Sequence, residues 1–166
     1  MIPDILEGRF QFVFDMGRDM IWTRDIVVLK KPYLIGPWGS ISGVFFGPFW
    51  YYFLSVPFIL SGGSPIASVL AVCFVNLAAI FIGYQFGKEI KNKRLGILIA
   101  FFFAFSRSQI AASFTAFHAN LLPFTTLLFI YSLYKLKIKQ KEILYLPLAG
   151  FLASLNFHLE PAAAIF

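Results

Sequence analysis

The chain has 166 residues, of which 59% are hydrophobic and 13% charged, and its mean hydropathy is +0.77. A soluble domain of this size would expose far too much apolar surface, so the composition argues against a soluble protein and favours an integral membrane protein. The single cysteine, Cys73, excludes an intrachain disulfide framework and is expected to be a small packing residue. No cluster of cysteine and histidine residues has the spacing of a zinc site.

Charged residues are scarce, yet three of them fall within "FVFDMGRDMIW", residues 12–22. Asp15 can cap a helix that starts there, because its carboxylate can accept hydrogen bonds from the backbone N–H groups of the first turn. Four residues then share one helix face, at i, i+3, i+4 and i+7: Asp15, Arg18, Asp19 and Trp22. The segment is either a capped amphipathic helix with a local ion pair, or a carboxylate base beside an arginine that binds phosphate.

Residues 36–48, "GPWGSISGVFFGP", predict a glycine-rich loop with two alternative roles. The loop is a flexible link at the bilayer surface, or its backbone N–H groups approach a lipid phosphate. It is not a P-loop, because no Gly-Lys-Ser/Thr sequence follows. The overlapping segment 44–61 is rich in Trp and Tyr and contains Pro48 and Pro57, so we expect an interfacial or re-entrant helix rather than a full span.

Four later segments are apolar enough to cross a membrane: about 65–87, 95–114, 120–134 and 143–166. The first carries no formal charge and exceeds the roughly 20 residues that a helical crossing takes. The third is short, and we expect the stems of Lys135 and Lys137 to extend it by snorkelling. The sequence therefore predicts an all-α integral membrane protein: a multi-span helical bundle at 65–166, preceded at 1–64 by an outer-face loop with interfacial helices.

Two lysine-rich runs set the expected orientation. Eight of the fourteen basic residues lie in "KEIKNKR" (88–94) and "KLKIKQK" (135–141), and such runs stay in the cytoplasm. They account for much of the net charge of +6 without a nucleic-acid partner. Two predicted spans separate the runs, so residues 1–64 are expected outside. A chain that starts outside needs an earlier span, and "EPAAAIF" stops within an apolar stretch, so we expect a fragment of a larger bundle.

This topology gathers the unusual polar side chains at the outer face. They are Asp15, Arg18, Asp19, His118, Asn120, Asn156, His158 and Glu160. Polar groups near hydrocarbon are costly and usually face an aqueous cavity, so one shared cavity would account for all of them. Taken singly, Asn120 could be a helix cap and His158 a packed core histidine, while Arg107 could snorkel outward or pair with an acid.

Three stretches of the chain, in order, carry a family resemblance: "FDMGRDMIWTRDIV…LIGPWGSISGVFFGPFWYYFLSVPFILSGG", "AFSRSQIAASFTAFHANLLPF" and "LASLNFHLEPAA". Together they resemble the bacterial GT-C membrane glycosyltransferases, in the dolichyl-phosphate-mannose protein mannosyltransferase-like and aminoarabinose transferase-like branch. The resemblance covers about residues 10–160. It implies transfer of a sugar from a polyprenyl-phosphate donor to a lipid, glycan or protein acceptor, with inversion, at the outer leaflet of the cytoplasmic membrane.

The resemblance also implies roles for individual residues. Asp15 would be the catalytic carboxylate that acts on the acceptor, Asp19 would support Asp15 or orient the acceptor, and Arg18 would help to hold the donor phosphate. Asn120 and His158 match motif positions at a hairpin tip and on the next helix. Displacement of a phosphate leaving group requires no metal ion, although the two aspartates could supply oxygen ligands to a divalent cation.

The chain departs from the family pattern at several positions, and one departure is "HAN" at 118–120 where the family has "NPN". Phe114 stands where an arginine is usual, Phe117 where a tryptophan is usual, and Gly47 where some relatives have a phosphate-binding lysine. Arg107 and Lys31 are then the candidates for the missing positive charge. The alternatives to a glycosyltransferase are a transporter or channel subunit, which the one-sided charge and the lack of an internal repeat disfavour, and a non-catalytic membrane scaffold.

Overall fold

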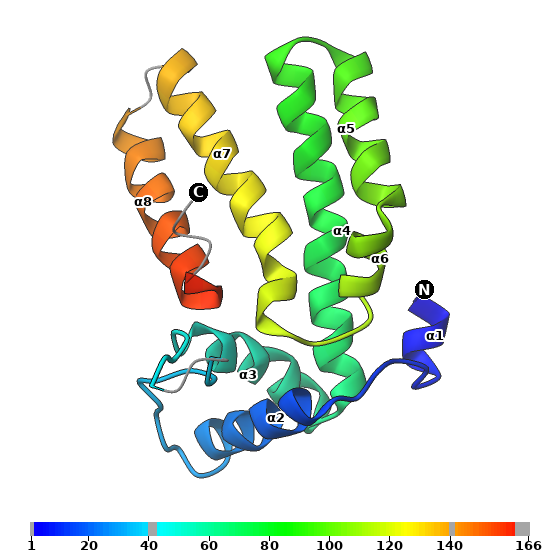
Figure 1. Cartoon of the computed structure of the whole chain (residues 1–166), viewed down its shortest axis with the longest axis vertical. Helices are drawn as coiled ribbons and strands as arrows, with labels where there is room; N and C mark the ends of the chain where they lie inside the picture. The colour runs from blue at the N-terminus through cyan, green and yellow to red at the C-terminus, as the bar shows by residue number, and fades with distance from the viewer. Residues whose placement is uncertain (1, 40–42, 140–141, 162–166) are drawn as a thin grey trace.

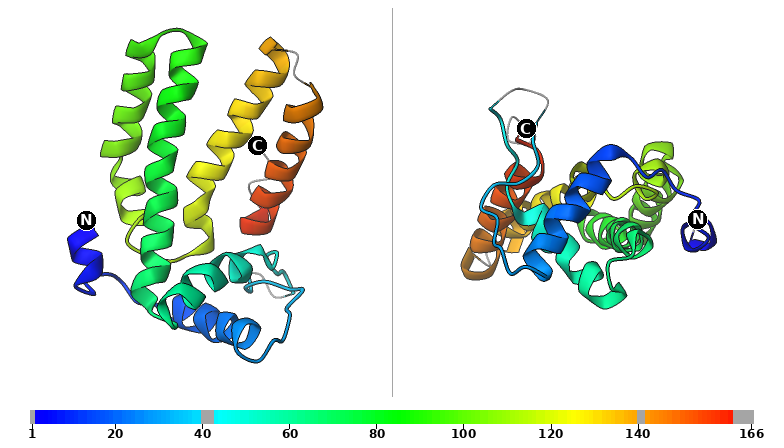
Figure 2. Two further views of the ribbon diagram at one scale, coloured as in Figure 1. Left: turned by 180° about the vertical axis from the view of Figure 1, so that it is seen from behind. Right: turned by 90° about the horizontal axis from the view of Figure 1, so that it is seen from below.

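The computed structural model describes residues 2–39, 43–139 and 142–161. Within these ranges the regular secondary structure is helical, apart from an isolated bridge between Trp38 and Phe45. The helices are α1 Ile2–Leu6, α2 Phe14–Val27, α3 Phe49–Ser61, α4 Pro65–Ile90, α5 Lys93–Phe105, α6 Arg107–Ala112, the 3-10 helix η1 His118–Leu121, α7 Leu122–Lys139 and α8 Glu142–Leu159. The helices α4, α5, α7 and α8 form a bundle, and α2 and α3 lie across one end of it (Figure 1; Figure 2).

Two of the described helices are long and apolar enough to cross a membrane. The first is α4, which has 26 residues and a mean hydropathy of 2.5 over its most apolar window. The second is the continuous helix His118–Ile138, made of η1 and most of α7, with a mean hydropathy of 1.3. The helices α3 and α8 are apolar but shorter. The all-helical prediction is therefore confirmed, and two of the four segments predicted to span form helices of spanning length.

The segment 95–114, predicted as a single span, does not form one continuous helix. Helix α5 ends at Phe105 and α6 starts at Arg107, because Ser106 leaves the helical conformation with ψ of 119°. The carbonyl oxygen of Ser106 instead accepts a hydrogen bond from the Ile110 N–H, which starts α6. Helix α5 alone has 13 residues, or about 20 Å at 1.5 Å per residue, which is short of the roughly 30 Å hydrocarbon core of a bilayer.

Glycines allow α5 to pack closely against the second half of α4. A Cβ on Gly87 would lie 2.8 Å from the Cα of Gly96, and a Cβ on Gly96 would lie 2.5 Å from the carbonyl oxygen of Tyr84. Because the obstructing atoms belong to the backbone, this approach requires glycine on both helices. In the turn between them, the Asn92 side chain caps α5 by accepting from the Leu95 N–H at 3.0 Å.

The most completely buried side chains lie where α2 and α3 pack against the first half of α4. This core contains Met16, Trp50, Tyr51, Leu54, Val69, Val72 and Cys73. Cys73 is fully buried and free, as expected for a packing residue. Burial of these apolar side chains fixes α2 and α3 against the bundle, in what we call the α2–α3 end.

The described parts of both lysine-rich runs, 88–94 and 135–139, lie at the opposite end of the bundle, which we call the lysine-rich end (Figure 1). Lys135 does not snorkel there, because it is buried and its ammonium group pairs with Glu89 of α4. The Tyr131 hydroxyl donates to a carboxylate oxygen of Glu89 at 2.6 Å, and the Tyr134 hydroxyl donates to the Glu89 carbonyl at 3.0 Å. These polar contacts join α7 to α4. Residues 140–141 lie outside the described residues.

Candidate functional site

An arginine between two aspartates forms the centre of the α2–α3 end. Nη1 of Arg18 is 2.8 Å from Oδ1 of Asp15. Both Nη2 and Nε of Arg18 are 2.9 Å from Oδ1 of Asp19. The i, i+3 and i+4 spacing on α2 brings the three side chains together, as expected for one helix face. We call these three residues the acid–arginine cluster.

Asp19 is fully buried, and both of its carboxylate oxygens accept hydrogen bonds. Oδ1 accepts from Arg18, and Oδ2 accepts from the indole N–H of Trp50 on α3 at 2.7 Å. Burial raises the pKa of Asp19, while the charge of Arg18 and the hydrogen bonds from Arg18 and Trp50 oppose this shift by stabilising the carboxylate. Because Asp19 faces no solvent, the geometry favours a supporting role over direct contact with a substrate.

Asp15 is the accessible carboxylate of the acid–arginine cluster. Its side chain is 45% exposed, against 15% for Arg18. The prediction that Asp15 caps the helix is wrong, because the N-cap of α2 is Val13 and Asp15 is the second helical residue. Its carboxylate pairs with Arg18 instead, so Asp15 is oriented by its neighbour and still open to a ligand.

His118 lies in η1 beside α3 and is buried. Three aromatic rings surround it, with centroid distances between 4.1 and 6.4 Å: Phe117, Phe46 and Trp50. Neither ring nitrogen has a hydrogen-bond partner within the described part of the chain. An unpaired buried imidazole is costly, so this ring has hydrogen-bonding capacity that a ligand or water can use. The charges of Arg18 and Asp15 act on it electrostatically.

The glycine-rich loop is held by hydrogen bonds at its two ends. The Gly36 N–H donates to the Phe46 carbonyl at 3.0 Å, and the Gly47 N–H donates to the carbonyl of His158 at 2.9 Å. A Cβ on Gly47 would lie 2.2 Å from Cγ of His158. In this arrangement position 47 has no room for a lysine side chain. Residues 40–42, at the tip of the predicted loop, lie outside the described residues.

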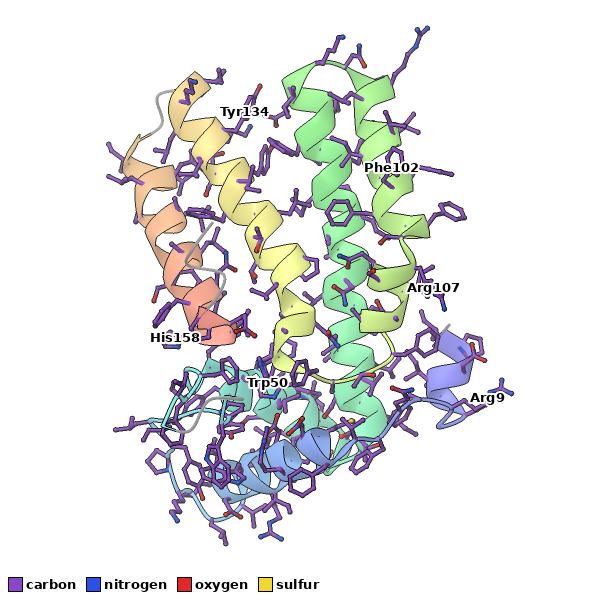
Figure 3. The ribbon with its side chains drawn as sticks, viewed as in Figure 1. Arg9, Trp50, Phe102, Arg107, Tyr134 and His158 are labelled. Carbon is purple, nitrogen blue, oxygen red and sulfur yellow. The ribbon has the colours of Figure 1, made fainter. Side chains whose placement is uncertain are left out.

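The last turn of α8 brings two further predicted residues to the α2–α3 end. His158 is partly buried and lines a cavity of about 220 Å³ between α3 and α8. Figure 3 shows His158 near the end of α8. Asn156 is buried, and its Oδ1 has no hydrogen-bond partner among the residues that the structure describes. Glu160 follows the helix, and its backbone N–H donates to the Asn156 carbonyl at 2.9 Å.

The other predicted residues do not join the acid–arginine cluster. The side-chain amide of Asn120 donates to the Thr115 carbonyl at 2.9 Å, so Asn120 stabilises the turn before α7 rather than capping it. Arg107 is exposed on α6 and points away from the bundle (Figure 3). Lys31 is exposed beyond the last turn of α2. Both of these cations lie apart from the two aspartates.

Sequence reasoning did not identify Trp50 and Tyr51 as part of the site. A buried indole N–H needs an acceptor, and Trp50 finds one in Asp19, 31 positions earlier in the chain. Tyr51 is buried close to Asp19 and Arg18, and burial raises the pKa of its hydroxyl. Both residues belong to the aromatic segment 44–61, whose composition indicates a membrane interface and carries no signal for this contact.

Within the described ranges, no group of three or more His, Cys, Asp or Glu side chains could hold a metal ion. The two aspartates that could supply oxygen ligands both pair with Arg18, whose positive charge opposes a bound cation.

No protein-family model matches the chain, and neither the curated proteins nor the solved structures contain a significant match. An exposed carboxylate, fixed by a guanidinium that is itself anchored in the core, can accept a proton from a bound hydroxyl group.

Proposed function

We propose that the protein is a membrane glycosyltransferase that moves a sugar from a polyprenyl-phosphate donor to a lipid, glycan or protein acceptor. The supporting observation is the arrangement of Asp15, which is 45% exposed and paired with Arg18. Arg18 is anchored by the buried Asp19, which in turn accepts a hydrogen bond from Trp50. Such a carboxylate is oriented and accessible, which are properties that activation of an acceptor hydroxyl requires.

Asp15 acts as the general base in this proposal. The acceptor oxygen forms a bond to the anomeric carbon of the sugar, and its proton passes to the Asp15 carboxylate. The bond between the anomeric carbon and the phosphate oxygen breaks, and its electron pair leaves with the phosphate. Attack opposite the leaving group inverts the anomeric centre. Arg18 holds the carboxylate in position and stabilises the negative charge that develops on the phosphate.

The proposal also places the protein in the cytoplasmic membrane, with the lysine-rich end inside and the α2–α3 end outside. Its support is the separation of the lysine runs from the acid–arginine cluster by the length of the bundle (Figure 1). Large apolar side chains are exposed along the bundle, among them Phe81, Phe102 and Phe151, each more than half exposed. Such a surface suits lipid rather than water. A donor with a polyprenyl tail would reach the outer end from the bilayer.

The direct test is Asp15→Asn in the full-length protein, expressed in cells that lack the wild-type gene. Mass spectrometry of membrane extracts measures the lipid-linked sugars that accumulate without transfer. Loss of a general base lowers turnover by about 10²- to 10⁴-fold, so we expect the variant to leave the donor uncleared.

Asp25→Asn is the matched control, because Asp25 lies on the same helix and pairs with Arg24 at 3.0 Å, away from the cluster. We expect this variant to clear the donor like the wild type. If Asp15→Asn reaches the membrane at the wild-type level and also clears the donor, Asp15 is not the base and a non-catalytic scaffold becomes the better interpretation.

A further inference from the structure

Asn76, in the first half of α4, is a buried polar residue that the proposed reaction does not use. It is 6% exposed, and neither its amide nitrogen nor its amide oxygen has a hydrogen-bond partner within the described residues. In a helix of spanning length there is no bulk water to satisfy such a group, so an unpaired amide is costly. A ligand that supplies a donor and an acceptor would remove this cost.

The Asn76 side chain lines a small space beside the break between α5 and α6. The space is about 60 Å³, and Gln109 and Ser113 form part of its wall. The Ser113 hydroxyl already donates to the Gln109 carbonyl at 2.9 Å, so the Asn76 amide is left to bind an occupant. This gap exists because Ser106 interrupts the helix that would otherwise pack along α4.

A longer apolar groove adjoins this polar space. It measures about 600 Å³ and runs between α4 and α5, with Tyr84 and Phe101 among its lining residues. Leu77, Ile80 and Ala104 line both the groove and the polar space, so the two are adjacent. Together they offer a hydrocarbon chain an apolar groove beside a small polar space in which the Asn76 amide is unpaired among the described residues.

We propose that this combined site binds an uncharged, hydroxyl-headed membrane lipid, with the hydroxyl on Asn76 and one chain in the groove. A carboxamide both donates and accepts, which matches a hydroxyl group, whereas a phosphate only accepts and carries charge. All the described residues that line the two spaces are uncharged, so an anionic headgroup would lack a counter-ion. The site depends on the membrane placement proposed above and not on sugar transfer.

The experiment uses a diacylglycerol with a photoactivatable diazirine in one acyl chain, and a phosphatidic acid with the same chains. Each probe is photolysed with the full-length protein in nanodiscs, and crosslinked residues are identified by mass spectrometry. We expect the diacylglycerol to label residues 77–84 and 97–104 at least several-fold more than the phosphatidic acid does. Asn76→Leu keeps the side-chain size and removes the hydrogen bond, so labelling there falls by about tenfold.

Phe74→Leu is the matched control, because Phe74 is an exposed residue of α4 that does not line the groove. It should leave the labelling unchanged. If Asn76→Leu fails to fold, the wild type is tested by competition instead: unlabelled diacylglycerol should reduce labelling of the groove by the diacylglycerol probe. Equal labelling by the two probes, or no effect of Asn76→Leu, overturns the hydroxyl assignment. An unlabelled groove means that protein or water fills it, and this overturns the proposal whether or not the preparation transfers sugar.

Discussion

Charged residues gather at both ends of the bundle, but their partners differ. At the lysine-rich end, Glu89 pairs with Lys135 and also accepts from Tyr131, while the lysines of the α4–α5 turn are exposed. At the α2–α3 end, Arg18 lies between the buried Asp19 and the exposed Asp15. At the lysine-rich end, the buried Lys135 and the partly exposed Glu89 therefore pair across two helices, whereas the α2–α3 end leaves one carboxylate accessible.

The two ends of the bundle also differ in their neutral polar groups. Beside the acid–arginine cluster, the ring nitrogens of His118 are buried without a hydrogen-bond partner in the described structure, and so is the side-chain oxygen of Asn156. Polar groups that hold helices together are normally fully paired, and unpaired ones are concentrated where ligands bind. The two ends therefore differ in how completely their buried polar groups are paired, and this difference supports the proposed placement of the reaction at the α2–α3 end.

The largest effect on stability is expected from Asp19→Ala. This change removes the acceptor of a mostly buried guanidinium and of a buried indole N–H, so the free energy of unfolding should fall by about 3–5 kcal/mol. Asp19→Asn should cost less, because its amide oxygen still accepts from Trp50. Denaturant titration in a mild detergent measures both variants. An Asp19→Ala protein as stable as the wild type would show that Asp19 does not anchor the cluster.

Gly47→Ala tests whether the loop is held against α8. The new Cβ would lie 2.2 Å from Cγ of His158, so we expect a loss of about 1–3 kcal/mol in the free energy of unfolding. Gly150→Ala on α8 is the control, because a Cβ there meets nothing within 4 Å. It should be neutral or stabilising by up to about 1 kcal/mol, since alanine favours a helix. If the two variants unfold alike, the loop does not pack on His158.

Lys135→Met probes the lysine-rich end and should have a smaller effect. Glu89 would lose its cation but keep its tyrosine partners and its partial exposure, so we expect a loss of about 1–2 kcal/mol, between the values for exposed and buried pairs. Lys91→Met, at an exposed position, should change stability by less than about 0.5 kcal/mol. A loss for Lys135→Met as large as that for Asp19→Ala would remove the contrast between the ends.

Hydropathy predicted the helical class. The lysine runs predicted that residues 88–94 and 135–139 lie at the same end of the bundle. They did so because these signals depend on composition over many residues. The break at Ser106 was missed, because the sequence there contains neither proline nor glycine, and Arg107 and Gln109, which follow, are good helix formers. The sequence also predicted the wrong N-cap for α2, because the Asp15 carboxylate pairs with Arg18 and does not cap the backbone N–H groups.

The contacts of the site that were missed all join residues far apart in the chain. Trp50 meets Asp19 from another helix, and Gly47 meets His158 after more than a hundred intervening residues. Neither contact has a periodic or local signal in the sequence. Burial of Lys135 was missed for the same reason, because its acid, Glu89, lies on a helix two spans earlier in the predicted topology.

Cysteine accessibility in intact cells tests most directly whether the two ends lie on opposite sides of the membrane. In full-length protein carrying Cys73→Ala, single cysteines replace the exposed residues Asp15 and Lys91, one at each end of the bundle. A membrane-impermeant maleimide should label Asp15→Cys from outside, and Lys91→Cys only after permeabilisation. Labelling of both positions from the same side, or in the reverse order, would contradict the proposed separation of the acid–arginine cluster from the cytoplasm.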